Sequence, residues 1–210
     1  MSCNSSNPWL AMLVLFLLTG SSMTQIPGDR RPKSILDYYF LLPPKYLPYL
    51  TADSRPAREA AIQIKDLDGG FLKSGLATDE VSTALALFKK SDGSDLIAVE
   101  NRSCPAACSS SLNLLLYANN QWTEVTHDLL PAIDASKIQA LLQRQYRNRP
   151  NEPIRQPQLI YTLRKRGESI EVNEHWSGMI LGAFEWANDA FTFKSEEAMG
   201  SNYRVLAATE

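Results

Sequence analysis

Cys104 and Cys108 have the most reactive side chains outside the N-terminal segment, in Ser103-Cys104-Pro-Ala-Ala-Cys108-Ser109. In an oxidising compartment, two cysteines this close in sequence form a disulfide by default. Closing so small a ring constrains the unfolded chain by about 2 kcal/mol in the loop-entropy model. The spacing therefore predicts a structural disulfide that fixes a loop.

Two other uses of this cysteine pair remain open. Thiol-disulfide enzymes place Cys-x-x-Cys at a helix N-terminus, whereas this spacing is one residue longer and its Ser- and Ala-rich flanks favour a loop. A metal site needs two more ligands, and the two histidines, His127 and His175, lie in different segments. We therefore expect no metal and no cofactor, with a thiol-disulfide protein as an alternative.

The pentapeptide Glu174-His175-Trp176-Ser177-Gly178 offers the richest set of side chains for acid–base chemistry. A serine nucleophile needs a base and an oxyanion hole. On a strand His175 and Ser177 would share one face, but no Gly-x-Ser-x-Gly elbow surrounds the serine. We interpret the segment as a strand end with an aromatic core residue. A hydrolase using His175 with Glu174 or Ser177 is the alternative.

Two further motifs are weaker. His127 and Asp128 are adjacent, so on a strand they would point to opposite faces, and a capping or surface role is expected. Asp66-Leu-Asp68-Gly69-Gly70 is similar to a calcium loop, but it has Gly at position five and no Glu at position twelve, which favours a turn. The sequence thus predicts no catalytic residue, with His127, His175 and Ser177 as weak candidates.

The first 28 residues contain no Asp, Glu, Lys or Arg, and an apolar block runs from Trp9 to Leu18. A short apolar core followed by small residues is typical of a cleaved secretory signal, here residues 1–22, although its start lacks the usual Lys or Arg. Ser21 replaces the cysteine that lipid attachment requires. We expect export to the periplasm or the medium, with residues 23–33 as an exposed lead-in.

The formal net charge of −2 argues against nucleic acid, which requires a basic surplus. After the leader, no apolar stretch reaches the 18 residues that mark a membrane-spanning helix. The expected partner is therefore a protein or a glycan, and no membrane span follows the leader.

Helical signals come first in the chain. Ser34 to Asp37 matches a helix-capping pattern, Pro43-Pro44 should end that helix, and a second short helix is expected from Ser54 to Ala61. A later helix should begin with a Ser136–Gln139 capping box and align Ile138, Leu141, Leu142 and Tyr146 on one side.

From residue 61 onward, short apolar runs alternate with turn-forming pairs, a pattern typical of antiparallel hairpins. The turns are expected at Asp68-Gly69-Gly70, Asp92-Gly93, Asn119-Asn120, Arg166-Gly167 and Asn188-Asp189. The strands are expected at Thr83–Phe88, Leu96–Val99, Leu112–Tyr117, Leu159–Leu163 and Met179–Trp186, with Ile170/Val172 and Phe191/Phe193 on strands that have one wet face.

These elements predict an α+β fold, mainly an antiparallel β meander of about eight strands with N-terminal helices and one inserted helix. We expect one domain over residues 34–195, with possible lobes at 61–147 and 158–195 joined by a connector containing Pro150, Pro153 and Pro157. Residues 196–210 should form a loose tail.

The two halves of the meander also resemble each other. Tyr117-Ala-Asn-Asn-Gln-Trp122 matches Trp186-Ala-Asn-Asp-Ala-Phe191. Upstream, Leu87 to Gly93 loosely parallels Leu163 to Gly167. The echo indicates either a duplicated two-hairpin unit with the cysteine loop inserted in the first copy, or hairpins that converged on one turn type.

Three stretches resemble a group of exported bacterial proteins without assigned function: Ser34-Ile-Leu-Asp-Tyr-Tyr-Phe-Leu-Leu-Pro-Pro-Lys-Tyr-Leu47, the run Ala86–Val99 and Gln121–Pro131. The resemblance covers about a quarter of the chain after the leader and implies an exported, β-rich domain. It carries over no catalytic residue. We therefore expect a non-enzymatic binding module of the bacterial envelope.

Overall fold

The computed structural model describes residues 34–50, 53–76, 78, 80–146, 157–165 and 168–195. The expected signal peptide, lead-in, Pro-rich connector, C-terminal tail and the turn at Arg166-Gly167 lie outside these residues, and so does the side chain of Tyr146. In the described part of the chain, no helix is both long enough and apolar enough to span a membrane.

The N-terminal helices form where the sequence predicts them. α1 spans Ile35–Leu41, and Ser34 and Asp37 form its capping box. The helix ends before Pro43-Pro44, because neither proline can donate the next helical hydrogen bond. A short 3-10 turn, η1 (Pro44–Tyr46), comes next. α2 spans Arg55–Ala60 and is capped by Ser54.

Ten strands form two antiparallel sheets in the described residues, more than the eight expected. The six-stranded sheet follows chain order and contains β1 (Ile62–Asp66), β2 (Phe71–Gly75), β3 (Val81–Lys89), β4 (Asp95–Ser103), β5 (Ser109–Ala118) and β6 (Gln121–Glu124). The four-stranded sheet, in order β10-β9-β8-β7, contains β7 (Leu159–Leu163), β8 (Ser169–Glu174), β9 (Ile180–Ala187) and β10 (Ala190–Ser195). The α+β hairpin meander predicted from the sequence is confirmed.

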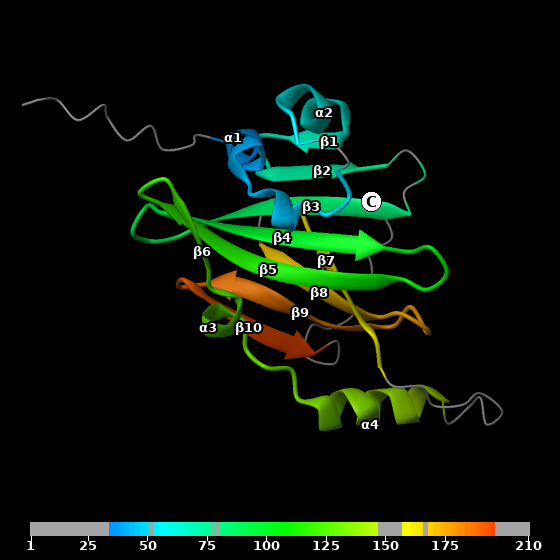
Figure 1. Cartoon of the computed structure of the whole chain (residues 1–210). Helices are drawn as coiled ribbons and strands as arrows, with labels where there is room; N and C mark the ends of the chain where they lie inside the picture. Colours follow the sequence, from blue (N-terminus) through cyan, green and yellow to red (C-terminus); the bar gives the residue numbers. More distant parts are fainter. Residues whose placement is uncertain are drawn as a thin grey trace, which may run out of the picture. The chain divides into compact units, whose positions relative to one another are not determined.

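Two helices connect the sheets. α3 (Thr126–Leu129) follows β6 directly, and α4 (Ala135–Tyr146) precedes the segment that leads to β7. In Figure 1, α4 lies on the β10 side of the four-stranded sheet, while α1 and η1 lie against the six-stranded sheet.

Each face of the six-stranded sheet packs against a different layer. On one face, Leu85, Ile97 and Leu115 pack against Ile35 and Tyr39 of α1. On the other face, the core extends into the four-stranded sheet and α4, and its buried members include Phe88, Ala98, Leu114, Ile170, Val172, Phe184, Phe191 and Ile138. The two sheets share one apolar core, and the division into lobes at 61–147 and 158–195 stays a prediction.

One feature of β8 differs from the expectation. Within β8, Ile170 and Val172 face the core as predicted. Glu171 lies between them on the opposite face, but it is only 6% exposed. Its carboxylate pairs with Arg164 and accepts a hydrogen bond from Asn173 at 2.8 Å. At Glu171 the second face of β8 is therefore not wet, because the ion pair with Arg164 covers it.

The two halves of the meander match in their connections. Five residues connect β3 to β4 (90–94) and β7 to β8 (164–168), five connect β4 to β5 (104–108) and β8 to β9 (175–179), and two close the last hairpin of each half. Both final turns have positive φ angles, at Asn119-Asn120 and at Asn188-Asp189. The same span is nevertheless 31 residues long in the first half (90–120) and 26 in the second (164–189), because β4 and β5 are longer than β8 and β9, so duplication and convergence both stay open.

The two echo hairpins also dock in the same way. Trp122 Nε1 donates to the Leu41 carbonyl at 3.0 Å, and Trp186 Nε1 donates to the Lys89 carbonyl at 3.1 Å. Each tryptophan packs on its cross-strand aromatic partner, Tyr117 or Phe191. These aromatic residues join the hairpins to neighbouring elements and so have a packing role.

Candidate functional site

The outer edge of β10 presents unpaired backbone groups. The two-residue turn at Asn188-Asp189 closes on Ala187 and Ala190, which makes this the first hydrogen-bonded pair of the hairpin. Because hydrogen-bonded and non-hydrogen-bonded pairs alternate, Thr192 and Lys194 also direct their backbone groups toward β9. The N–H and C=O groups of Phe191, Phe193 and Ser195 therefore point away from the sheet.

These outward groups meet no backbone partner among the described residues. The side chains of Phe191 and Phe193 turn toward the core, where Phe193 makes an edge contact with Phe184, its centroid 5.2 Å away. β10 thus combines an open hydrogen-bonding edge with a row of apolar side chains.

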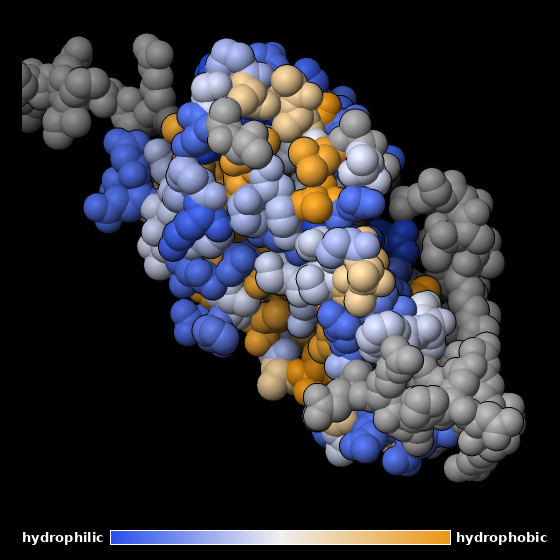
Figure 2. Space-filling model, turned by 45° about the vertical axis from the view of Figure 1, so that its right-hand side comes forward, coloured by the Kyte–Doolittle hydropathy of each residue, from blue (hydrophilic) through white to orange (hydrophobic). Residues whose placement is uncertain are grey.

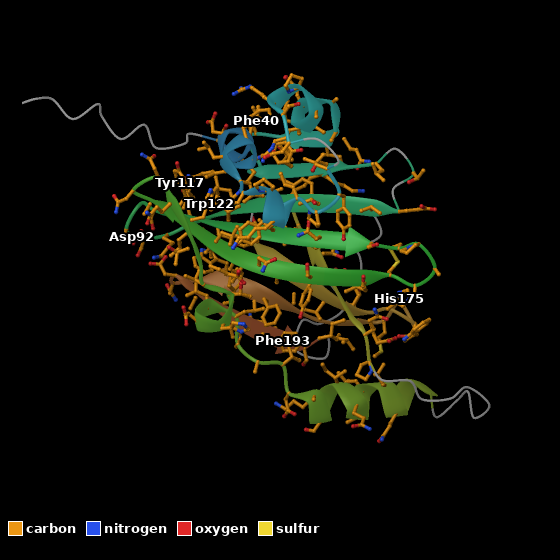
Figure 3. The ribbon with its side chains drawn as sticks, viewed as in Figure 1. Phe40, Asp92, Tyr117, Trp122, His175 and Phe193 are labelled. Carbon is orange, nitrogen blue, oxygen red and sulfur yellow. A yellow bond between two sulfur atoms is a disulfide. The ribbon has the colours of Figure 1, made fainter. Side chains whose placement is uncertain are left out.

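A groove of about 460 Å³ runs along this edge. Its floor is formed by Leu181, Phe191 and Phe193, and its opposite wall by residues of α4 and the preceding segment: Ile133, Ile138 and Leu141. Lys137 and Asp134 add charged groups to the lining of the same groove. In Figure 3, Phe193 lies on β10 on the side of α4, and in Figure 2 apolar atoms reach the surface in several places between polar ones. This volume is within the range of ordinary ligand sites.

The wall of the groove is held by the first turn of α4. Asp134 Oδ1 accepts hydrogen bonds from Ser136 N at 2.9 Å and from Ser136 Oγ at 2.6 Å, and its carbonyl accepts from Lys137 N and Ile138 N. These hydrogen bonds hold the pKa of Asp134 below its usual value. Asp134 is therefore the N-cap, and the capping box expected at Ser136 and Gln139 is wrong.

Ile138 and Leu142 attach α4 to the shared core, at 5% and 2% exposure. Ile138 lies in the wall of the groove, so the face of α4 that holds the helix in place also borders the groove. The predicted apolar face of this helix is confirmed for Ile138, Leu141 and Leu142.

Gly182 allows β10 to approach β9 closely at the groove. A Cβ atom at this position would lie 2.2 Å from the Lys194 carbonyl oxygen and 2.7 Å from the Phe193 ring. Such distances are far below van der Waals contact, so any side chain here would displace β10.

A second cavity of about 670 Å³ lies on the other side of the 130–138 segment, between α3 and the sheets. His127 and Tyr161 line it, together with apolar side chains such as Leu112 and Phe184. Burial raises the pKa of the Tyr161 hydroxyl, and no hydrogen bond to that hydroxyl is formed by the described residues. The structure places His127 in this cavity and His175 elsewhere, so it does not bring the two histidines together.

The other edge of the four-stranded sheet, at β7, contacts side chains of the six-stranded sheet. Tyr161 N donates to Ser110 Oγ at 3.2 Å, and Arg102 Nη2 donates to the Tyr161 carbonyl at 2.7 Å and to Thr162 Oγ1 at 2.9 Å. Arg102 Nε in turn donates to Glu100, which is 4% exposed. Side chains of β4 and β5 thus satisfy the Tyr161 backbone, in the middle of the β7 edge.

A disulfide joins Cys104 to Cys108 in the loop between β4 and β5, as the spacing predicts. The loop contacts the β8–β9 turn, where His175 Nε2 accepts a hydrogen bond from Cys108 N at 3.2 Å. The accepting Nε2 carries no proton, so in the neutral ring the proton is on Nδ1. The loop is thereby attached to the second sheet.

The Glu174–Gly178 segment differs from its predicted geometry. His175 to Ser177 form a turn after β8, so the two side chains do not share a strand face. Ser177 Oγ and Ser177 N both donate to Glu174 Oε2 at 2.7 Å, and Trp176 is 43% exposed. The Glu174 carboxylate therefore caps this turn, and Trp176 is not the core residue we expected.

The remaining candidate motifs are structural in the described residues. Asp66 Oδ1 accepts a hydrogen bond from Gly69 N at 2.8 Å, as expected for a turn. In the described ranges, no group of three or more His, Cys, Asp or Glu side chains is placed to hold a metal.

Sequence analysis did not single out the β10 groove. The alternation of Phe191 and Phe193 with polar residues predicts the strand correctly, but it cannot show that this strand ends the sheet.

No protein-family model and no curated protein matches the sequence. Among solved structures, the chain is similar to a domain of an uncharacterized protein from Porphyromonas gingivalis W83, at 14% identity and a TM-score of 0.49. The match covers 78% of this chain and 99% of that domain.

Proposed function

We propose that this protein is a non-enzymatic binding module of the bacterial envelope, and that the groove between β10 and α4 holds a protein partner. The observation that carries the proposal is the open backbone edge of β10 beside an apolar groove. Unpaired N–H and C=O groups on an edge strand are a template for another chain. The export component rests on the sequence pattern of residues 1–22.

The aromatic residues favour a protein over a glycan. Sugar binding uses exposed aromatic faces, but Tyr38, Tyr117 and Trp122 pack against one another with their ring centroids between 4.9 and 6.1 Å apart. In the groove, Phe191 is 5% exposed and packs on Trp186. These rings are used for internal packing.

The proposal is tested by capture from an envelope extract with matched variants of α4. Lys137→Trp places a large ring at the groove, whereas Gln139→Trp places the same ring on an exposed position of α4 outside the groove lining. We expect the wild type and Gln139→Trp to retain the same partner and Lys137→Trp to lose it, with circular dichroism showing that all three fold. Equal recovery by all three would contradict the groove as the site.

Export is tested separately. N-terminal sequencing of the protein recovered from the periplasm or the medium should start near Ser22 to Thr24. An exported chain that begins at Met1 would show that the leader is not cleaved.

A further inference from the structure

We infer that the partner enters the groove as an extended peptide that adds to β10 as a fifth strand of the smaller sheet; this inference rests on the proposed function and specifies its ligand. The chemistry of the edge selects this occupant. On one side, an extended chain offers the N–H and C=O of every second residue, which is the spacing that Phe191, Phe193 and Ser195 present, whereas a compact ligand cannot satisfy all of them.

The position of the groove gives the side-chain preference of the peptide. Residues directly opposite each other on neighbouring antiparallel strands share a face of the sheet. Peptide residues opposite Phe191 and Phe193 would therefore point toward the shared core and the wall at Ile138 and Leu141. These alternate positions should be apolar.

The intervening peptide residues lie opposite Thr192 and Lys194, whose side chains are on the outer face and exposed. Lys194 pairs there with Glu185 across the hairpin. Polar or acidic residues should therefore occupy these positions, and the recognised segment has alternating apolar and polar residues. Its specificity comes from the apolar positions, because the backbone pairing is independent of sequence.

The middle of the β7 edge is less available to a peptide than the β10 edge. Arg102 and Ser110 already use the N–H and C=O of Tyr161. A peptide at β7 would have to displace these side chains and expose the Glu100 carboxylate. The β10 edge requires no such displacement among the described residues.

The first test is hydrogen exchange on the full chain with a selected peptide as the probe. Random octapeptides displayed on phage are selected against the immobilised protein, and the most enriched sequence is synthesised. In the free protein the amides of Phe191, Phe193 and Ser195 should exchange rapidly and those of Thr192 and Lys194 slowly. Saturating peptide should slow the first three at least tenfold and leave the other two unchanged.

The second test scans the same peptide with N-methyl groups. Methylation removes an N–H, so it should weaken binding at least tenfold at alternate residues, those whose N–H faces β10, and less than twofold at the residues between. On the protein, Ser195→Pro removes one outward N–H without breaking the β9 ladder and should weaken binding at least fivefold. Ser195→Ala is the matched control and should bind like the wild type.

Each negative result overturns a defined statement. Peptide binding without alternation in either test overturns strand addition while the proposed function stands. If the outward amides are already protected in the free protein, the edge is occupied by another segment of this chain or by a second copy. A concentration-dependent dimer that Ser195→Pro abolishes would identify the second copy. If no peptide is enriched and Lys137→Trp captures the same envelope partners as the wild type, both proposals fail.

Discussion

The two edges of the four-stranded sheet differ in whether side chains bind their outward backbone groups. At β7, Arg102 and Ser110 satisfy the Tyr161 backbone, and a buried carboxylate, Glu100, holds the arginine in place. At β10, the outward groups of Phe191 and Phe193 face a groove. Because unprotected edges promote uncontrolled pairing, proteins usually blunt them. A sheet with one closed and one open edge restricts pairing to the open one.

The comparison also separates structural charge from surface charge. Glu100 and Glu171 are buried and paired with arginines, whereas Lys194 and Glu185 near the groove are exposed by 47% and 39%. Charges near β7 are thus buried within the fold, and the Lys194–Glu185 pair near β10 is exposed at the surface. Substitutions at the two edges should differ in kind.

The largest expected effect is at the closed edge. Arg102→Ala removes the donor to β7 and the guanidinium that binds the buried Glu100 carboxylate, so we expect a loss of about 3 kcal/mol in the free energy of unfolding. Lys194→Ala at the open edge is the control and should cost less than about 0.5 kcal/mol, since its ion pair is exposed. Urea denaturation measures both, and equal losses would remove the distinction between the edges.

Gly182→Ala should displace β10, the strand at the open edge, because Gly182 lies beside it on β9. Its Cβ would overlap the Lys194 carbonyl, so β10 must move, at a cost of about 2 to 3 kcal/mol for overpacking. The same variant should lose peptide binding. Gly93→Ala is the control: that glycine also has a positive φ of 78° but no atom within 4 Å of the new Cβ, so it should cost about 1 kcal/mol and retain binding. Thermal unfolding and peptide titration distinguish them, and similar results for both would argue against close strand approach.

The cysteine loop should affect stability without affecting the groove. Replacing Cys104 and Cys108 together by Ser releases the loop that contacts His175, and we expect a loss of about 2 kcal/mol from the chain-entropy term. The wild type in dithiothreitol should unfold like this variant. Peptide affinity should stay within twofold of the wild type, and a larger change would connect the loop to binding.

The smallest expected effect is a pH dependence at the closed edge. Burial raises the pKa of Glu100, although the Arg102 guanidinium partly lowers it. The folded protein therefore binds this proton more tightly than the unfolded chain, so the stabilising contribution is full below the ordinary value of 4.5 and is lost as pH rises through the raised pKa.

We therefore expect the stability of the wild type relative to Glu100→Gln to decrease as the pH rises above 4.5. Chemical denaturation at several pH values gives the difference directly. A difference that is constant, or that grows with pH, would show that Glu100 is ionised without penalty.

Local rules in the sequence account for most of the elements. Ser34 and Asp37 predict the start of α1, and Asn119-Asn120 and Asn188-Asp189 predict two hairpin turns, because capping and positive φ are properties of neighbouring residues. The same rules failed at Ser136, where Asp134 two residues earlier provides the cap. They also misplaced Trp176, because a turn replaced the expected strand.

The candidate site depended on contacts that sequence spacing does not encode. The wall of the groove comes from residues 131–141 and its floor from residues 181–195, which meet only because α4 attaches to the shared core through Ile138. Likewise, the cover of the β7 edge comes from Arg102 and Ser110, more than 50 residues away in sequence. Neither relation could be read from a local pattern.

The sequence by itself determined the antiparallel hairpins, the cysteine pair and the alternation of Phe191 and Phe193 with polar residues, since each depends on neighbours along the chain. Only the tertiary structure decided that β10 is an edge, that Gly182 brings it close to β9, and that α4 lies across from it. Strand order in a sheet is set by packing between distant segments, and that packing closes one edge with Arg102 and leaves the other open.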